Sequence, residues 1–350
     1  MIRSCRTKDY NWDFDTVTGF FSRWGKTQDD NPSFSPLGPE ILDLEISTIC
    51  SGTEHGPCKF CYKSNTPQGK SMSLEQFKTV LNRMPSNLTQ IAFGIGDVHG
   101  NKELEQILHA TRDKSIIVPN ITINGYNCTD STYSILTRNC GSVAVSRYND
   151  DVCFNAVREL TNRGLEQVNI HQLLSADTFQ ECLDLIDKVK TDPRLSKLNA
   201  LVFLMVKQKG RAKNVANVSL EQFQELVNKA LLNDIPLGFD SCSAPSFLKA
   251  TIDHPNFKTF AQFIEPCEAF LFSSYCNVDG EFFPCSFCEG EPGWETGIKV
   301  DEDTDFLKDV WFNPRMVEWR QKLLTSSNNC ECSIKHICRS CPIHSNVKIC

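Results

Sequence analysis

Short apolar runs alternate with longer amphipathic stretches along most of this 350-residue chain. The apolar runs are rich in Val, Ile, Leu and Phe, which is typical of buried strands, and the stretches between them repeat apolar residues at helical spacing. The pattern predicts strands at 41–47, 90–95, 115–123, 142–146, 167–173, 199–206 and 236–239. It predicts helices at 73–84, 102–111, 130–138, 150–163, 178–190 and 219–233, with Ser73, Asp130 and Ser219 as N-terminal caps.

Repeated βα units predict an α/β fold in which right-handed crossovers build a parallel sheet. We therefore expect residues 41–240 to form a partial (β/α)6 barrel of the TIM type. Residues 1–40 are rich in Asn, Asp, Pro and Ser, and we interpret them as an irregular lead-in. After about residue 241 the βα rhythm stops and Gly, Pro and Cys dominate. Residues 241–350 are therefore predicted to be a small domain that metal organises.

Composition argues against nucleic-acid-binding, secreted and membrane-spanning proteins. A formal net charge of −7 argues against a broad nucleic-acid surface. The sequence has no signal-peptide pattern and no apolar stretch near the ~20 residues of a membrane span, so we expect a cytoplasmic protein without a membrane partner. The chain nevertheless has 18 cysteines, ten of them at or beyond Cys242. Because cytosolic thiols are kept reduced, grouped cysteines there usually bind metal.

Three cysteines follow the first predicted strand: Cys50, Cys58 and Cys61. Active sites of parallel α/β folds form at this edge of the sheet. Four cysteines close a [4Fe-4S] cluster, whereas three leave one iron open to a cofactor or substrate. The group therefore indicates a catalytic cluster more than a structural one.

The segment Cys58-Lys59-Phe60-Cys61-Tyr62 resembles the cluster loop of the radical S-adenosylmethionine superfamily. The usual spacing there is C-x3-C-x2-C, whereas the first gap here is seven residues long. Gly52, Gly56 and Pro57 would let the longer loop turn back, and a longer loop costs little closure entropy. The resemblance implies that Cys50, Cys58 and Cys61 hold a catalytic [4Fe-4S] cluster that binds S-adenosylmethionine.

Later strand ends extend this resemblance. Gly94-Ile95-Gly96-Asp97 is similar to the family's Gly-Gly-Glu-Pro segment, which receives the methionyl amino group. Asn124 follows the third strand like the family's residue near the ribose, and Ser146 ends the fourth like a cofactor-binding serine. By the same resemblance Phe60 would lie against the adenine. Each of these segments is equally compatible with an ordinary βα turn.

The C-terminal cysteines are similar to the SPASM extension of radical enzymes, C-x(9-15)-G-x4-C followed by C-x2-C-x5-C-x3-C and a last cysteine. Two gaps are one residue shorter here. The resemblance implies a first auxiliary cluster on Cys267, Cys285 and Cys341, with Cys242 or Cys276 as the fourth ligand. It implies a second auxiliary cluster on Cys330, Cys332, Cys338 and Cys350. Cys288 belongs to neither ligand set. It could be a further ligand or a thiol that donates a hydrogen atom to the substrate, but we prefer to interpret it as an inert residue.

The resemblance also implies a reaction. Such enzymes cleave S-adenosylmethionine reductively to a 5'-deoxyadenosyl radical, which abstracts a hydrogen from the substrate. A flavodoxin or ferredoxin would supply the electron. We expect a peptide or protein substrate, although the residues before Cys50 are too few for a winged-helix leader-binding module. Ser286 stands where sulfatase-maturing relatives carry an Asp base, which disfavours formylglycine formation.

Three alternatives remain open. A radical dehydrogenase or mutase could act on a small molecule such as a sugar or an aminocyclitol. The C-x2-C pairs Cys58/Cys61, Cys285/Cys288 and Cys338/Cys341 are also compatible with a non-catalytic zinc protein. The third alternative is a ferredoxin-like electron carrier, although a protein that only holds closed clusters does not need a large barrel.

Overall fold

The structure is a computed structural model that describes residues 1–114, 117–331 and 334–344. The chain divides into two compact units, and each is treated by itself below. The first unit comprises Met1–Ser51, Asn65–Val143 and Ala269–Arg320. The second unit comprises Gly52–Ser64, Ala144–Glu268 and Gln321–Cys350.

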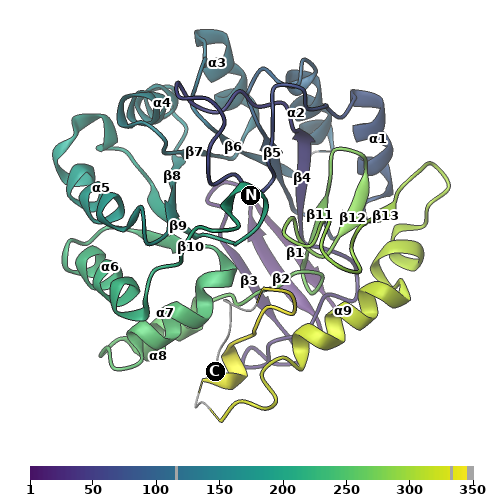
Figure 1. The fold of residues 1–350 in the computed structure, drawn as a ribbon. Helices are drawn as coiled ribbons and strands as arrows, with labels where there is room; N and C mark the ends of the chain where they lie inside the picture. Colours follow the sequence, from purple (N-terminus) through teal and green to yellow (C-terminus); the bar gives the residue numbers. More distant parts are fainter. Residues whose placement is uncertain (115–116, 332–333, 345–350) are drawn as a thin grey trace. The chain divides into compact units, whose positions relative to one another are not determined.

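The first unit begins with a small antiparallel sheet of three strands (Figure 1): β1 (Ile2–Arg6), β2 (Asn11–Asp15) and β3 (Phe21–Trp24). The interpretation of residues 1–40 as irregular was therefore wrong. In β2 the aromatic residues Trp12 and Phe14 are buried, while Asp13 and Asp15 lie on the other face. This period-2 alternation is typical of a half-buried strand. The Asn and Asp residues of the segment led to the irregular interpretation, because these residue types are common in turns.

The main sheet of the first unit has the strand order β6-β5-β4-β11-β12-β13. Neighbours pair in parallel from β6 to β11, and β12 and β13 add antiparallel pairs. The strands are β4 (Ile41–Ser47), β5 (Gln90–Ile95), β6 (Val118–Ile123), β11 (Ser273–Cys276), β12 (Glu281–Phe283) and β13 (Ile298–Lys299). The helices are α1 (Leu74–Arg83), α2 (Leu104–Asp113), α3 (Asp130–Asn139) and the π-helix η4 (Phe306–Trp311).

The second unit contains β8 (Gln167–Leu174), β9 (Ala200–Met205) and β10 (Leu237–Phe239), which pair in parallel in this order. Its helices are α4 (Asp150–Asn162), α5 (Phe179–Thr191), α6 (Leu220–Leu232), α7 (Ala244–Thr251) and α8 (Phe257–Gln262). Short 3-10 turns are η1 (Pro193–Leu195), η2 (Gly210–Ala212), η3 (Ser241–Ser243) and η5 (Lys335–Ile337). The division between the units falls within β7 (Ser142–Ser146) and α9 (Pro314–Leu324).

The predicted α/β class is confirmed, and the described strands form an open sheet. All seven predicted strands and all six predicted helices are present close to their expected bounds. Residues 115–116 of the third predicted strand lie outside the described residues. One detail was wrong, because Thr129 caps α3 and Asp130 is its first helical residue. Two further helices, α7 and α8, lie beyond residue 241 with no strand between them. The domain boundaries at 40 and 240 stay a prediction.

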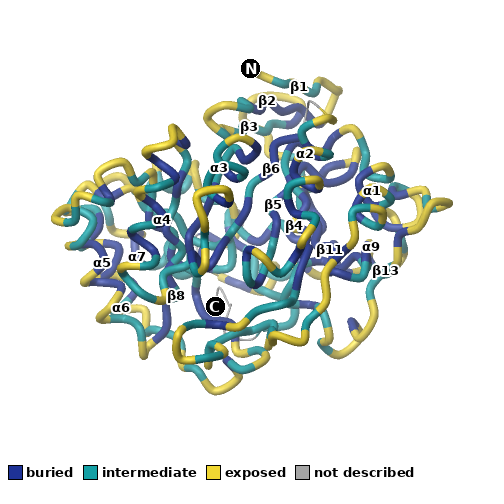
Figure 2. The backbone as a smooth tube through the Cα atoms, turned by 90° about the horizontal axis from the view of Figure 1, so that it is seen from above, coloured by how far each residue is buried: buried dark blue, intermediate teal, exposed yellow. Residues whose placement is uncertain are grey.

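Figure 2 shows that exposed residues gather on the loops and helices, while the parallel strands are mostly buried or partly buried. In β4, Leu42, Leu44 and Ile46 are at most 1% exposed, whereas Asp43 on the opposite face is accessible. In β8, Ile170 is fully buried and its neighbour His171 is partly exposed. Since helices must cover one face of such a sheet, the accessible polar face is the one available to a ligand.

A buried ion pair stabilises the N-terminal sheet. Glu40 is 1% exposed, and its two oxygens accept hydrogen bonds from Nε and Nη2 of Arg23 at 2.8 and 2.6 Å. The hydroxyl of Tyr10 donates to the same carboxylate at 2.7 Å. The Arg23 guanidinium also lies 3.6 Å from the centre of the Phe272 ring. These contacts join β3 to the segments that precede β4 and β11.

We predict that Arg23→Met lowers the free energy of unfolding by about 3–5 kcal/mol, because it leaves a buried carboxylate without its guanidinium partner. Arg6→Met is the matched control, since Arg6 pairs with Asp13 at 2.6 Å on the exposed face of the same sheet. Arg6→Met should lower the free energy of unfolding by only about 0–1 kcal/mol. Urea unfolding followed by circular dichroism measures both, and equal effects would contradict the prediction.

Candidate functional site

In the first unit, hydrogen bonds join the segment after β4 to the end of β5. The backbone N–H of Asp97 donates to the carbonyl of Ile49 at 2.8 Å, and the N–H of Ser51 donates to Asp97 Oδ2 at 2.8 Å. The N–H of Cys50 donates to Thr66 O at 2.9 Å. The predicted ligand Cys50 is therefore held at the carboxyl end of β4, beside the strand end that carries Gly96 and Asp97.

Asp97 also reaches the next strand. Asn124 Nδ2 donates to Asp97 Oδ1 at 3.0 Å, and Asn124 Oδ1 accepts the N–H of Tyr126 at 3.0 Å. Two residues that were predicted to bind cofactor are thus bound to each other. Within the first unit they fix the ends of β4, β5 and β6 together, so their structural role is to position this edge.

The two glycines near the end of β5 differ in the space around them. A Cβ on Gly96 would lie 2.2 Å from Ile49 O and 2.7 Å from Cys50 Cβ, so no larger residue fits there without moving the cysteine. A Cβ on Gly94 would lie 3.7 Å from its nearest neighbour, which is an ordinary contact. Close approach to Cys50 therefore explains why position 96 requires glycine, but it gives no reason for glycine at position 94.

In the second unit, the cluster loop turns back as its glycines suggested. Gly52 and Gly56 have φ values of 88° and 89°, and Thr53 and Gly56 exchange two backbone hydrogen bonds of 2.9 Å. Farther along, the N–H of Cys61 donates to Cys58 O at 3.3 Å, so the C-x2-C segment is itself a turn. The long gap before Cys58 thus contains a closed turn.

Arg211 holds this C-x2-C turn from the segment between β9 and α6. Its Nε donates to Cys58 O at 2.7 Å, and its backbone N–H donates to Cys61 O at 3.0 Å. Sequence analysis missed Arg211 because the residue follows no motif and lies far from the cysteines in the chain. It acts on the backbone of the loop and leaves both thiols accessible to a metal.

Phe60 lies beside the end of β7 in the second unit. The centre of its ring is 5.6 Å from that of Tyr148, which is 39% exposed, and Ser146 at the end of the strand is partly exposed. Tyr148 was also missed, although an exposed aromatic residue two positions after a strand is a usable signal. The two rings form an accessible aromatic surface of the kind on which an adenine could stack.

The second unit also carries ionisable groups on β8 and after β9. Burial lowers the pKa of His171 to about 4, although Asp240 acts in the opposite direction. Lys207 is 3% exposed and donates to Asp240 Oδ2 at 2.6 Å. Burial opposes its charge, but Asp240 and the thiols of Cys242 and Cys341 raise its pKa.

The remaining predicted ligands are distributed over both units. Cys267, Cys276 and Cys338 are buried, and Cys285 and Cys341 are partly exposed. Cys330 is disulfide-bonded, so iron binding there would require the reduced thiol. Cys332 and Cys350 lie outside the described residues. Within the described ranges no three His, Cys, Asp or Glu side chains lie in metal-binding geometry, so both auxiliary ligand sets stay predictions.

The residues at the first cysteine group nevertheless fit an iron-sulfur cluster. Cys50, Cys58 and Cys61 are partly exposed, and none is in a disulfide. Thiolates are the ligands that such clusters prefer. Asp97 holds the backbone after Cys50 in the first unit, and Arg211 holds the backbone of Cys58 in the second.

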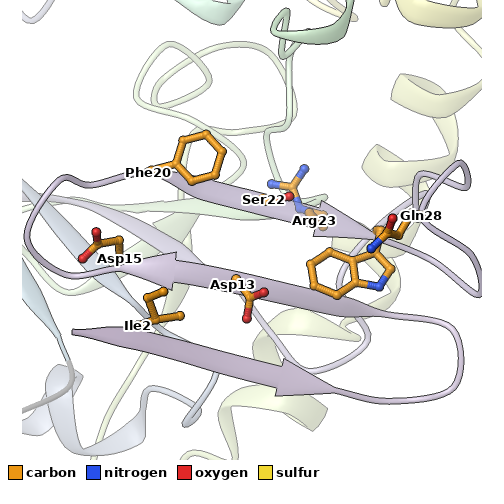
Figure 3. Close-up of a pocket in the computed structure, with 8 residues that line it drawn as sticks. Ile2, Asp13, Asp15, Phe20, Ser22, Arg23 and Gln28 are labelled. Carbon is orange, nitrogen blue, oxygen red and sulfur yellow. The ribbon is translucent and has the colours of Figure 1, made fainter.

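A separate pocket of about 520 Å³ lies over the N-terminal sheet. Figure 3 shows Phe20, Asp15 and Ile2 near one end of the sheet and Gln28 at the other, with Asp13 between them. It shares no residue with the predicted cofactor site. Its carboxylates are already engaged, because Asp13 pairs with Arg6 and Asp15 accepts the N–H of Val17.

Comparison with solved structures identifies the fold. The chain is similar to SuiB of Streptococcus suis bound to the precursor peptide SuiA, with 15% identity, 87% of this chain and 72% of SuiB covered, and a TM-score of 0.68. SuiB bound to S-adenosylmethionine gives a TM-score of 0.64, at 15% identity over 87% of this chain and 73% of SuiB. The protein anSMEcpe with bound AdoMet and the Cp18Cys peptide gives 0.60, at 14% identity over 86% of this chain and 88% of that one.

These structural neighbours are radical S-adenosylmethionine enzymes, so the resemblance seen in the sequence extends to the fold. The partial-barrel prediction is confirmed by the same likeness. No protein-family model matches the chain, and no curated protein matches its sequence. In the described part of the chain, no helix has the length and apolar character needed to cross a membrane.

We predict that Gly96→Ala destabilises the protein by about 1–3 kcal/mol, the usual cost of overpacking, because the new methyl group must displace Ile49 and Cys50. Gly94→Ala is the control from the same strand and should change stability much less. Thermal unfolding of the two variants measures the difference. Equal losses would show that close approach to the cysteine segment is not what requires glycine at 96.

His171 predicts a dependence of stability on pH. Its folded pKa of about 4 lies below its ordinary value of 6.5, so between these values the unfolded chain binds a proton that the folded chain does not. Stability should therefore fall as the pH falls through this window, by on the order of 3 kcal/mol. His171→Gln should flatten this part of the profile, whereas exposed His109→Gln should leave it unchanged. Denaturant unfolding at pH 7 and pH 4.5 tests both.

Proposed function

We propose that this protein is a radical S-adenosylmethionine enzyme whose catalytic [4Fe-4S] cluster is bound by Cys50, Cys58 and Cys61. The observation that carries the proposal is the likeness of its fold, over 87% of the chain, to SuiB, which has been solved with S-adenosylmethionine bound. The position of Cys50 directly after β4, and the C-x2-C turn of Cys58 and Cys61, support the assignment. A zinc protein or an electron carrier would require neither this fold nor an open ligand position.

The chemistry that the cluster would supply is one-electron cleavage of S-adenosylmethionine to methionine and a 5'-deoxyadenosyl radical. The residues of the chain would bind and orient the cofactor. Backbone groups at Gly94 and Gly96 would receive the methionyl part, and Phe60 with Tyr148 would offer an aromatic surface to the adenine. Asp97 and Asn124 would keep the strand ends in place.

We propose a peptide or protein as the substrate. SuiB is solved with its precursor peptide and anSMEcpe with a Cp18Cys peptide, and both cover most of this chain. His171 is kept neutral on the accessible face of β8, where an imidazole can accept a hydrogen bond or a proton from a substrate. We further propose a cytoplasmic location, a flavodoxin or ferredoxin as the reductant, and auxiliary clusters in the C-terminal cysteine region.

The decisive experiment is anaerobic reconstitution followed by incubation with S-adenosylmethionine and dithionite. We predict release of 5'-deoxyadenosine by the wild-type protein and none by the double variant Cys58→Ala/Cys61→Ala. The double variant should also lose about four irons per chain, which corresponds to one cubane, and should keep the remaining iron. Chromatography and iron analysis measure the two results.

Cys153→Ala is the matched control, because Cys153 is a fully buried thiol of the same unit that belongs to no predicted ligand set. It should retain both cleavage and iron. Wild-type protein that binds zinc in place of iron, or that holds iron without releasing 5'-deoxyadenosine, would refute the enzymatic proposal. Co-expression with short peptides encoded beside the gene, followed by mass spectrometry, tests the substrate class.

A further inference from the structure

The strands β4, β5 and β6 of the first unit carry small or polar residues on the face opposite their buried apolar one. Pairing of the strands places these residues in two rows, which are Asp43, Ala92 and Asn120 in the first row and Glu45, Gly94 and Thr122 in the second. All of them except Glu45 are exposed or partly exposed. Rows of bulky branched residues fill the interior of an ordinary barrel. Neither row here contains such a residue, so the two rows do not form an apolar core.

The middle position of each row has little or no side chain. Ala92 stands between Asp43 and Asn120, and Gly94 is its counterpart in the second row. A Cβ on Gly94 would come no closer than 3.7 Å to any atom, and its three nearest neighbours all belong to the adjacent strand β4. Glycine inside a strand often marks a place where a ligand approaches the backbone. Room for a ligand therefore gives a reason for glycine at position 94, which close approach to Cys50 does not.

Asp43 is the exposed carboxylate on this face of β4. Among the described residues, no group makes a hydrogen bond or an ion pair with it. Glu45, in contrast, is buried and accepts a hydrogen bond from the hydroxyl of Tyr275 at 3.1 Å. The surrounding protein nevertheless desolvates Asp43 and raises its pKa to about 6. Solvent therefore reaches a carboxylate that protein atoms surround and leave without a partner.

A carboxylate in such surroundings gains most from a cation. Desolvation disfavours its ionised form, and a positive charge at hydrogen-bond distance compensates for the lost water. Glu45 in the next row is a second acidic group, which favours a cationic ligand over an anionic one. The aliphatic part of a lysine or arginine side chain can pack on small apolar surface such as that of Ala92 while its charged end pairs with a carboxylate.

We propose that Asp43 binds the cationic side chain of a lysine or arginine in the peptide substrate, and that Ala92 and Gly94 leave the room which that side chain occupies. Asp43 is then the residue of the first unit that selects basic peptides. The inference rests on the proposed function only in taking the substrate to be a peptide. It concerns binding, so it holds whether or not the chain cleaves S-adenosylmethionine.

Retention of blocked heptapeptides by the full-length, anaerobically reconstituted protein tests the proposal. Three libraries of random sequence differ only in a fixed central residue, which is lysine, arginine or Nε-acetyllysine, and mass spectrometry measures the fraction of each that stays bound. We expect the wild type to retain the lysine or the arginine library about tenfold better than the acetylated one, the ratio that one charge-assisted hydrogen bond gives. Asp43→Asn should lose most of this preference.

Asp113→Asn is the matched control, because Asp113 is exposed at the end of α2 in the same unit and its replacement changes the net charge equally. It should keep the wild-type ratio, which separates the role of Asp43 from a general attraction of basic peptides to a chain of net charge −7. Equal preference in the wild type and in Asp43→Asn overturns the proposal. Equal retention of all three libraries by the wild type overturns it as well.

Ala92→Leu is a second variant, which fills the room beside Asp43 and leaves every charge in place. It should also lose the preference for basic peptides, and it decides the question should Asp43→Asn fail to fold. A wild-type preference in Ala92→Leu would contradict the proposed place of the side chain. Release of 5'-deoxyadenosine, measured without peptide, reports on the proposed function alone.

Discussion

The hydrogen bonds of Asp97 are the constraint on which the candidate site of the first unit depends. Its carboxylate accepts one bond from the backbone after β4 and one from Asn124 after β6, while its own N–H bonds to Ile49. Parallel strands expose their carbonyl ends at one edge, where backbone groups need partners. Asp97 supplies those partners, and it thereby fixes the segment that carries Cys50.

A second constraint is the difference between the two faces of the sheet. Leu42, Leu44 and Ile46 of β4 and Ile170 of β8 are buried on one face, whereas Asp43 and His171 lie on the opposite face and are exposed or partly exposed. There desolvation keeps His171 neutral, while Lys207 remains charged because Asp240 lies beside it. A face of this kind combines accessible surface with groups of defined charge, which a bound substrate requires.

The parts that the sequence predicted correctly are those governed by local pattern. The βα units have strong periodicity over many residues, and their strands and helices lie close to the expected bounds. The N-terminal sheet was missed because aromatic and acidic residues alternate there over only a few positions. Arg211 could not be predicted, since it meets Cys58 only when distant segments fold together, whereas Tyr148 was missed although its position after a strand was a signal. Thr129 caps α3 because its side chain, not that of Asp130, accepts the backbone N–H of Thr132.

The bonds of Arg211 have a consequence for engineering the chain. The segment between β9 and α6 supports the turn of Cys58 and Cys61 through its backbone as well as through its guanidinium. Changing the length of that segment by even one residue would therefore shift the cysteines, although nothing in its own sequence suggests a link to them.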